Sequence, residues 1–131
     1  MLENDAIPSS LDGCSDRPNC IADDIDAVNE RLRPIPFHVS LDQAGAAMSR
    51  ALAALPRTET VVIRGPYLRA ECRSPIFGFV DDVELLADQG EGLIHFRSAS
   101  RVGWYDFGVN RRRLIRLSAG LRQQLMALEP V

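Results

Sequence analysis

The sequence predicts an α+β fold, a two-layer sandwich in which an antiparallel three-stranded meander packs against two helices. Apolar residues recur at helical spacing over 41–55 and over 109–127. The segment between these helices contains three runs of alternating polarity, at 59–73, 78–87 and 93–101. The connectors between the runs are short, and short connectors join antiparallel neighbours. One helix therefore precedes the meander and one follows it, and both are expected to cover its apolar face.

Both predicted helices have clear sequence signals. Ser40 followed by Gln43 is a capping box at the start of the first helix, and Pro56 cannot continue that helix. The second helix is predicted by leucines that fall within a narrow arc of a helical wheel. These leucines are Leu114, Leu117, Leu121, Leu125 and Leu128. Each helix thus has one apolar face to bury.

Alternation within the predicted strands separates apolar from charged side chains. In the first strand Leu68, Ala70 and Cys72 share one face, and we expect "RGP" at 64–66 to bend this strand. On the opposite face, acids of the middle strand lie between arginines of its neighbours. This polar face holds Arg69, Glu71, Arg73, Asp82, Glu84, His95, Arg97 and Arg101.

Residues 1–36 are expected to form an irregular N-terminal arm before a single domain at 37–131. The arm contains four of the eight prolines and shows little periodicity, although one short helical turn fits within it. The longest apolar runs are only a few residues, and the first residues lack the pattern of a signal peptide. We therefore expect no transmembrane segment, and a soluble chain as given.

Charge is distributed unevenly along the chain. Residues 1–50 contain nine acids and four arginines, residues 51–91 contain seven and four, and residues 92–131 contain two and seven. Because the first two thirds are acidic, the basic end is expected to face the protein's own carboxylates rather than nucleic acid. No nucleic-acid partner is expected.

The cysteine spacing leaves two states open. Cys14 and Cys20 lie close enough in sequence to form a small disulfide, and two free thiols fit the sequence equally well. Because the chain has three cysteines, a bridge between Cys14 and Cys20 would leave Cys72 unpaired. No C-x2-C pair occurs, and His38 and His95 stand on separate elements, so neither a metal nor another cofactor is expected.

Three consecutive arginines stand where the last helix is expected to begin, although positive charge opposes the helix dipole there. We expect Asp106 or Asn110 to cap the free amides, and the arginines to complete a charged site with nearby carboxylates. Arginine suits such a site because its planar fork recognises carboxylate or phosphate. The candidate ligand-binding residues are Arg73, Asp82, Glu84, Arg97, Arg101, Asp106, Asn110, Arg111 and Arg113. A solvated ladder of salt bridges explains the charged strands equally well.

Four motifs resemble one known family. They are "PNC" at 18–20, "YLRAECRS" at 67–74, "FGFVDDVEL" at 77–85 and "RSASRVGWYDFGVNRRRL" at 97–114. Together they resemble the bacterial and plastid family of the domain of unknown function 1499, over about residues 14–125. The resemblance implies no established activity. It implies a place at the cell envelope, with the cytoplasm as alternative, because many relatives carry an N-terminal signal or membrane segment, and it favours a bridge between Cys14 and Cys20.

Three functions fit these observations. The favoured one is a non-catalytic binding domain that holds a small anion or an acidic group of a protein partner at the charged site. The alternative is a hydrolase with Asp82 or Glu84 as base and the arginines stabilising negative charge. Flanking arginines lower carboxylate pKa values, which disfavours an acid–base pair. A third reading gives the motifs a purely structural role.

Overall fold

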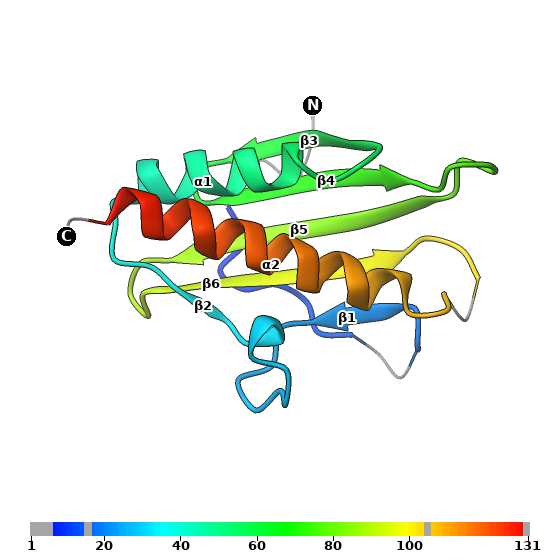
Figure 1. Ribbon diagram of the computed structural model, residues 1–131, viewed down its shortest axis with the longest axis horizontal. Coiled ribbons are helices and arrows are strands. Elements are labelled where there is room, and N and C mark those ends of the chain that lie inside the picture. The colour runs from blue at the N-terminus through cyan, green and yellow to red at the C-terminus, as the bar shows by residue number, and fades with distance from the viewer. Residues whose placement is uncertain (1–6, 15–16, 104–105, 130–131) are drawn as a thin grey trace.

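The computed structural model describes residues 7–14, 17–103 and 106–129 and confirms the α+β fold. The two helices lie side by side across a sheet (Figure 1). The elements in chain order are β1 (Cys20–Ala22), η1 (Glu30–Leu32), β2 (Ile35–Pro36), α1 (Leu41–Ala53), β3 (Thr58–Arg64), β4 (Tyr67–Arg73), β5 (Val80–Asp88), β6 (Leu93–Ser100) and α2 (Val109–Leu128).

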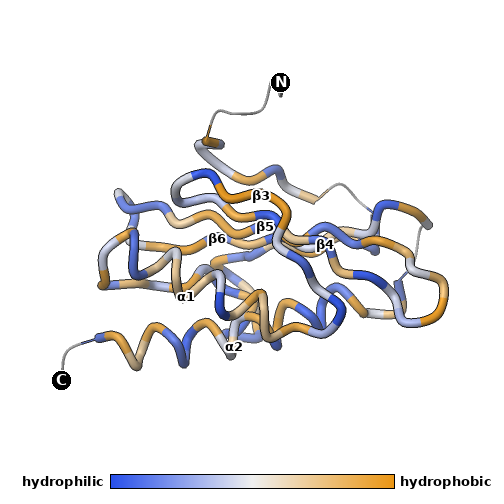
Figure 2. Tube along the Cα trace, turned by 90° about the horizontal axis from the view of Figure 1, so that it is seen from above, coloured by the Kyte–Doolittle hydropathy of each residue, from blue (hydrophilic) through white to orange (hydrophobic). Residues whose placement is uncertain are grey.

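Six strands form one antiparallel sheet. The strand order is β1-β6-β5-β4-β3, and β2 pairs with the same edge of β6 as β1 does. Seen from above, both helices lie on one side of the sheet (Figure 2). We call the side away from the helices the open face.

The segment predicted as one bent strand at 59–73 is a hairpin of β3 and β4. Gly65 has a φ of 57° and forms a two-residue turn with Pro66, closed by the pair of Arg64 and Tyr67. Glycine adopts left-handed backbone at little cost, so the chain reverses here instead of bending. The meander therefore has four strands, β3 to β6, where three were expected.

The N-terminal arm is more regular than its prolines predict. β1 pairs with the end of β6, where Cys20 lies opposite Ala99. β2 pairs with the beginning of β6, where Ile35 lies opposite Ile94. These short strands cover the outer edge of β6, whose backbone groups would otherwise lack partners. The η1 turn is the single helical turn that the sequence allowed.

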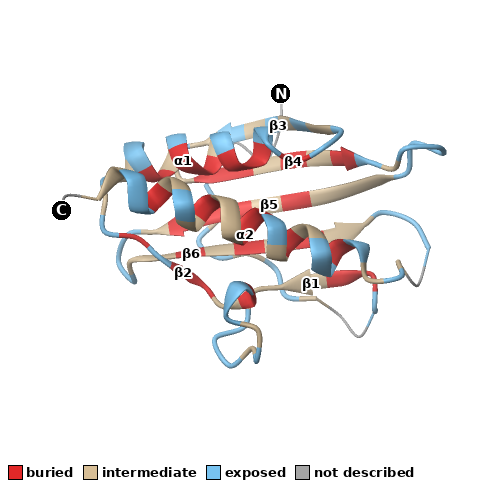
Figure 3. Cartoon of the chain, viewed as in Figure 1, coloured by how far each residue is buried: buried red, intermediate tan, exposed pale blue. Residues whose placement is uncertain are grey.

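The core lies between the helices and the inner face of the sheet (Figure 3). The capping box of α1 is present, because Ser40 Oγ accepts from the Gln43 amide at 3.1 Å and the Gln43 side chain accepts from the Ser40 amide at 3.1 Å. The helix ends at Ala53, two residues earlier than expected. The largest fully buried core side chains include Met48, Leu52, Leu68, Leu85, Phe96, Leu114, Leu117 and Leu121.

Residues 7–14 pass over the open face, on the side opposite the helices (Figure 2). Cys14 and Cys20 form a disulfide, with the two sulfurs 2.08 Å apart, so of the two states that the spacing allowed the structure has the bridged one. Cys72 is a free, buried cysteine. The bridge ties the arm to the start of β1.

Replacing Cys14 and Cys20 together by serine is expected to lower the free energy of unfolding by about 2–3 kcal/mol, because the bridge restricts the unfolded chain. Urea denaturation of the variant and the parent measures this difference. Reductant should destabilise the parent to the same extent and leave the variant unchanged. Equal stability of parent and variant would show that the bridge does not contribute.

Candidate functional site

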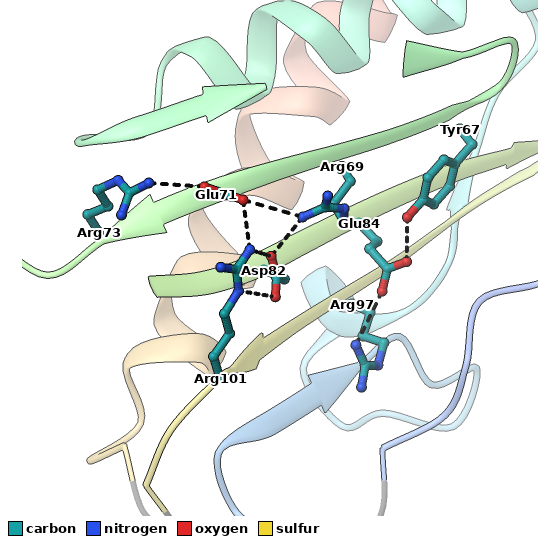
Figure 4. Close-up of polar contacts among 8 residues, drawn as sticks. All are labelled: Tyr67, Arg69, Glu71, Arg73, Asp82, Glu84, Arg97 and Arg101. Carbon is teal, nitrogen blue, oxygen red and sulfur yellow. Dashed lines mark hydrogen bonds and ion pairs between the residues drawn. The ribbon is translucent and has the colours of Figure 1, made fainter. Parts of the chain in front are cut away.

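The open face carries a ladder of charged side chains, which we call the charged face. The register places Glu84 of β5 between Arg69 of β4 and Arg97 of β6, and places Glu71 opposite Asp82. These side chains point toward one another (Figure 4). The charged face consists of Tyr67, Arg69, Glu71, Arg73, Asp82, Glu84, Arg97 and Arg101.

Arg101 closes one end of the charged face. Its Nη2 lies 2.7 Å from Glu71 Oε2 and 2.8 Å from Asp82 Oδ1, while its Nε donates to Asp82 Oδ2 at 2.9 Å. Arg69 Nη1 approaches Asp82 at 3.0 Å from the neighbouring strand. The hydrogen bonds from Arg101, which outweigh burial, lower the pKa of Asp82. Asp82 is therefore a fixed anion and not the protonated carboxyl that a general acid requires.

Glu84 is held equally firmly at the other end. Arg97 Nη1 lies 3.2 Å from Glu84 Oε1, and the Tyr67 hydroxyl donates to Glu84 Oε2 at 2.6 Å. Burial, followed by the hydrogen bond to Glu84, raises the pKa of Tyr67, so the phenol keeps its proton. Both oxygens of Glu84 thus have partners, and neither is free to act as a base.

The expected contacts between strand arginines and strand acids are present. The charged face contains four arginines and three carboxylates, so it has little net charge to offer a ligand. The four arginines are Arg69, Arg73, Arg97 and Arg101, and the three acids are Glu71, Asp82 and Glu84.

A second polar network lies on the opposite side of the sheet, at the start of α2. Asn110 is fully buried, with 0% of its surface exposed. Its Oδ1 accepts from Ser98 Oγ at 2.5 Å and from Arg113 Nη1 at 2.8 Å. Its Nδ2 lies 3.1 Å from the Asn19 carbonyl and 2.9 Å from Ser100 Oγ. One side chain therefore joins α2, β6 and the N-terminal arm.

Two acids compensate the positive charge at the start of α2. Asp106 accepts from the backbone amides of Gly108 at 2.8 Å and Asn110 at 2.9 Å. Burial alone would raise the pKa of Asp106, but these hydrogen bonds outweigh it and lower the pKa. Arg113 Nη1 lies 2.8 Å from Asp81 Oδ2, with 14% and 13% of the two side chains exposed. A cap and a largely buried ion pair thus explain how arginines are tolerated here.

The nine candidate residues do not share one surface. The reason is that α2 packs on the side of the sheet away from the open face, so the residues at its start lie opposite the charged strands (Figure 2). Arg73, Asp82, Glu84, Arg97 and Arg101 lie on the charged face, whereas Asp106, Asn110 and Arg113 lie on the helix side. Arg111 is exposed and has no ion pair among the described residues. A role of these residues in ligand binding stays a prediction.

One family accounts for nearly the whole chain. The family described as "Protein of unknown function (DUF1499)" matches residues 10–121. The chain belongs to the DUF1499 family. It has no significant match to a curated protein. The DUF1499 block at 79–85 supplies Asp81 to the helix side and Asp82 and Glu84 to the charged face, so one motif serves both networks.

A pocket of about 370 Å³ lies in the DUF1499 domain between the chain after α1, the end of β4 and the first turns of α2. We call it the arginine pocket, because five of the residues that line it are arginines. Its arginines are Arg57, Arg73, Arg112, Arg113 and Arg116, and its apolar wall consists of Leu55, Pro56 and Val109.

Three of the pocket arginines lack acidic partners. Within the described part of the chain, no carboxylate lies within ion-pair distance of Arg57, Arg112 or Arg116. Arg57 Nε donates to the Arg73 carbonyl at 3.0 Å, and Arg112 Nη1 donates to the Phe107 carbonyl at 2.9 Å. Unlike the charged face, the arginine pocket therefore concentrates positive charge that no carboxylate of the described residues neutralises.

The candidate residues named from the sequence include two of the pocket arginines, Arg73 and Arg113, and omit the other three. Arg112 and Arg116 are four residues apart, so the predicted helix already placed them on one side. Arg57 follows the helix-ending proline and has a φ of 51°. Nothing in its local sequence indicates that it meets α2, because that contact depends on how the layers pack.

A second cavity, of about 400 Å³, lies under residues 9–13 at the opposite end of the sheet from the arginine pocket. It suits no anion, because acids line it. They are Asp12, Asp23, Asp88 and Glu91, beside His95. Over the residues that the structure places, no group of three or more potential ligands could hold a metal ion. In that same part of the DUF1499 chain, neither helix is long and apolar enough to span a bilayer.

His95 is held between two acids beside this cavity. Its Nδ1 lies 2.9 Å from Asp23 Oδ2, and its Nε2 lies 2.7 Å from Glu91 Oε1. Burial would lower the pKa of His95, but the hydrogen bonds and charges of Glu91 and Asp23 outweigh it and raise the pKa. When it is protonated, His95 therefore links β6 to the chain that follows β1 through ion pairs.

Stability from His95 should depend on pH. Because its pKa is raised in the folded state, the contribution is present below the unfolded pKa and is lost as pH rises through the folded value. His95→Gln should cost roughly 0.5–1 kcal/mol at about pH 5.5 and less at about pH 8.5, as measured by urea unfolding. His38→Gln, at an exposed site, is the control. An equal loss at both pH values would contradict the ionic role of His95.

Proposed function

We propose that this DUF1499 domain is a non-catalytic module that binds a small anion, or an acidic group of a partner, in the arginine pocket. The observation that carries the proposal is that three arginines of one cavity have no acidic partner in the described part of the chain. Arg112 and Arg116 lie one turn apart on α2, and such like-charged pairs are destabilising by about 0.2–0.5 kcal/mol. A bound anion offsets this repulsion.

The composition of the pocket suits a phosphate-like or carboxylate group. Guanidinium groups donate in a planar fork that matches these anions, and several can converge on one ligand. The volume of about 370 Å³ falls within the range of small-molecule sites. Leu55 and Val109 give the pocket an apolar side as well. The pocket is thus suited to an anionic group that carries an apolar or neutral portion.

The two other readings of the sequence explain less of the geometry. A hydrolase would need a carboxylate that is free to take or give a proton, whereas Asp82 and Glu84 are fully engaged by Arg101, Arg97 and Tyr67. A purely structural role accounts for the Asn110 network. It gives no reason why three arginines around a cavity have no acidic partner among the residues that the structure describes.

Calorimetric titration with inorganic pyrophosphate, in about 0.15 M salt, tests the proposal. The parent should bind in a saturable manner with one site. The variant Arg57→Gln/Arg112→Gln/Arg116→Gln should bind roughly ten-fold more weakly or worse, because each substitution removes a guanidinium charge from the pocket that would otherwise attract the anion.

A matched variant controls for net charge. Arg31→Gln/Arg50→Gln/Arg111→Gln removes three exposed arginines that do not line the pocket. It should keep the affinity of the parent to within about two-fold, since screening weakens distant charges. Equal losses in the two triple variants, or no saturable binding by the parent, would refute the proposal.

A further inference from the structure

The turn between β4 and β5 exposes large apolar side chains. Ile76, Phe77 and Phe79 are 83%, 76% and 55% exposed. The turn has a defined geometry, because the Ser74 amide donates to the Phe79 carbonyl and the Phe79 amide donates to Ser74 Oγ, each at 2.9 Å. The rings of Phe77 and Phe79 stack with their centroids 5.6 Å apart. Packing of the fold does not explain why apolar residues stand at these positions, since their side chains bury little surface against the core.

The turn extends beyond the helices at one end of the sheet (Figure 1) and is exposed (Figure 3). The connection from β6 to α2 reaches the same end and exposes Val102 and Phe107. The Arg101 amide donates to the Val80 carbonyl at 3.1 Å, which joins the start of this connection to the start of β5. Two neighbouring loops thus present apolar side chains at one end of the domain.

The arginine pocket lies at this same end. Arg73, which lines the pocket, is separated from Ile76 by only two residues. Arg112 donates to the carbonyl of Phe107 at 2.9 Å. Phe107 therefore stands directly beside Arg112, which has no acidic partner within the described residues, and the turn with Ile76 begins next to the pocket residue Arg73. This combination is typical of surfaces that insert into the interface of an anionic bilayer.

We infer that this end of the domain docks onto an anionic lipid bilayer. Ile76, Phe77 and Phe79 enter the boundary between headgroups and acyl chains, and the arginine pocket binds lipid phosphates. The inference rests on the proposed function, and names the lipid headgroup as the anionic group. Complementary charge selects this occupant, because the surface joins a protruding apolar tip to unneutralised positive charge.

Flotation with vesicles tests the inference at about 0.15 M salt. The parent should bind vesicles of phosphatidylcholine with about 30% phosphatidylglycerol, and should not bind pure phosphatidylcholine. The variant Phe77→Ser/Phe79→Ser should lose roughly ten-fold or more in partitioning while it binds pyrophosphate as the parent does. The triple variant of Arg57, Arg112 and Arg116 should lose both vesicle binding and pyrophosphate binding.

The matched control replaces two other exposed apolar residues, in Ile25→Ser/Val28→Ser, on the loop between β1 and η1. It should bind vesicles as the parent does. A parent that binds pyrophosphate but no anionic vesicles would overturn the docking and leave the proposed function intact. Unchanged vesicle binding by Phe77→Ser/Phe79→Ser, or an equal loss in the control, would also overturn it.

Discussion

Replacing Asn110 by alanine is expected to lower the free energy of unfolding by about 3 kcal/mol or more. The truncation removes a fully buried amide whose oxygen accepts from Ser98 Oγ and Arg113 Nη1 and whose nitrogen donates to the Asn19 carbonyl and Ser100 Oγ. Each hydrogen bond lost contributes about 0.5–1.5 kcal/mol, and these four are lost together. Urea denaturation followed by far-UV circular dichroism measures the effect.

Gln123→Ala is the control for the Asn110 variant, because Gln123 lies exposed on the same helix. Its free energy of unfolding should change by no more than about 0.5 kcal/mol. A loss at Asn110 as small as that of the control would mean that the network does not hold α2 to the sheet and the arm.

Arg113→Gln and Arg111→Gln are expected to change stability in opposite directions. Arg113 forms a largely buried ion pair with Asp81, and breaking such a pair costs about 3 kcal/mol because the acid remains buried. Arg111 is exposed in the first turn of α2, where removing positive charge stabilises a helix by a few tenths of a kcal/mol. The double variant should therefore melt below the parent, as differential scanning calorimetry would record.

A double-mutant cycle separates the ion pair from other effects of the Arg113 change. Asp81→Asn with Arg113→Gln should be more stable than the sum of the single losses predicts, since neither charge is then left alone. Strict additivity would contradict the pairing of Asp81 with Arg113.

The fold class and the helices could be predicted because they depend on local signals. The capping box at Ser40 and the leucine stripe of the last helix are both present in the structure. The prediction of a three-stranded meander was wrong in the number of strands, because the polarity pattern of 59–73 continues through the turn at Gly65 and Pro66. Periodicity does not register a two-residue turn when both flanking strands keep alternating.

The candidate site was predictable only in part. Alternation correctly placed Arg97 and Glu84 together, since register follows from the pleat. It could not show that Asp106, Asn110 and Arg113 lie on the other side of the sheet, because their placement depends on where α2 begins after a loop. The arginine pocket was missed for the same reason, as it forms only when the chain after α1 meets α2 and the end of β4.

The long motif at 97–114 contributes to both networks. Arg97 and Arg101 belong to the charged face, and Asn110 belongs to the buried network. The buried half of the motif, centred on Asn110, fixes the start of α2 against β6 and the arm. This anchoring positions Arg112 and Arg116 at the cavity, where no acid among residues 7–14, 17–103 and 106–129 pairs with them. Rigid support of a charged site by a buried hydrogen-bond network reduces the cost of holding the side chains in place.

Nuclear magnetic resonance of the arginine Nε–Hε groups, followed during titration with pyrophosphate, tests the arginine pocket most directly. We expect saturable shifts of the signals of Arg57, Arg112 and Arg116, while those of Arg69 and Arg101 on the charged face stay in place because carboxylates already occupy them. Shifts confined to the charged face, or small shifts spread evenly over all 15 arginines, would contradict an anion site in the arginine pocket.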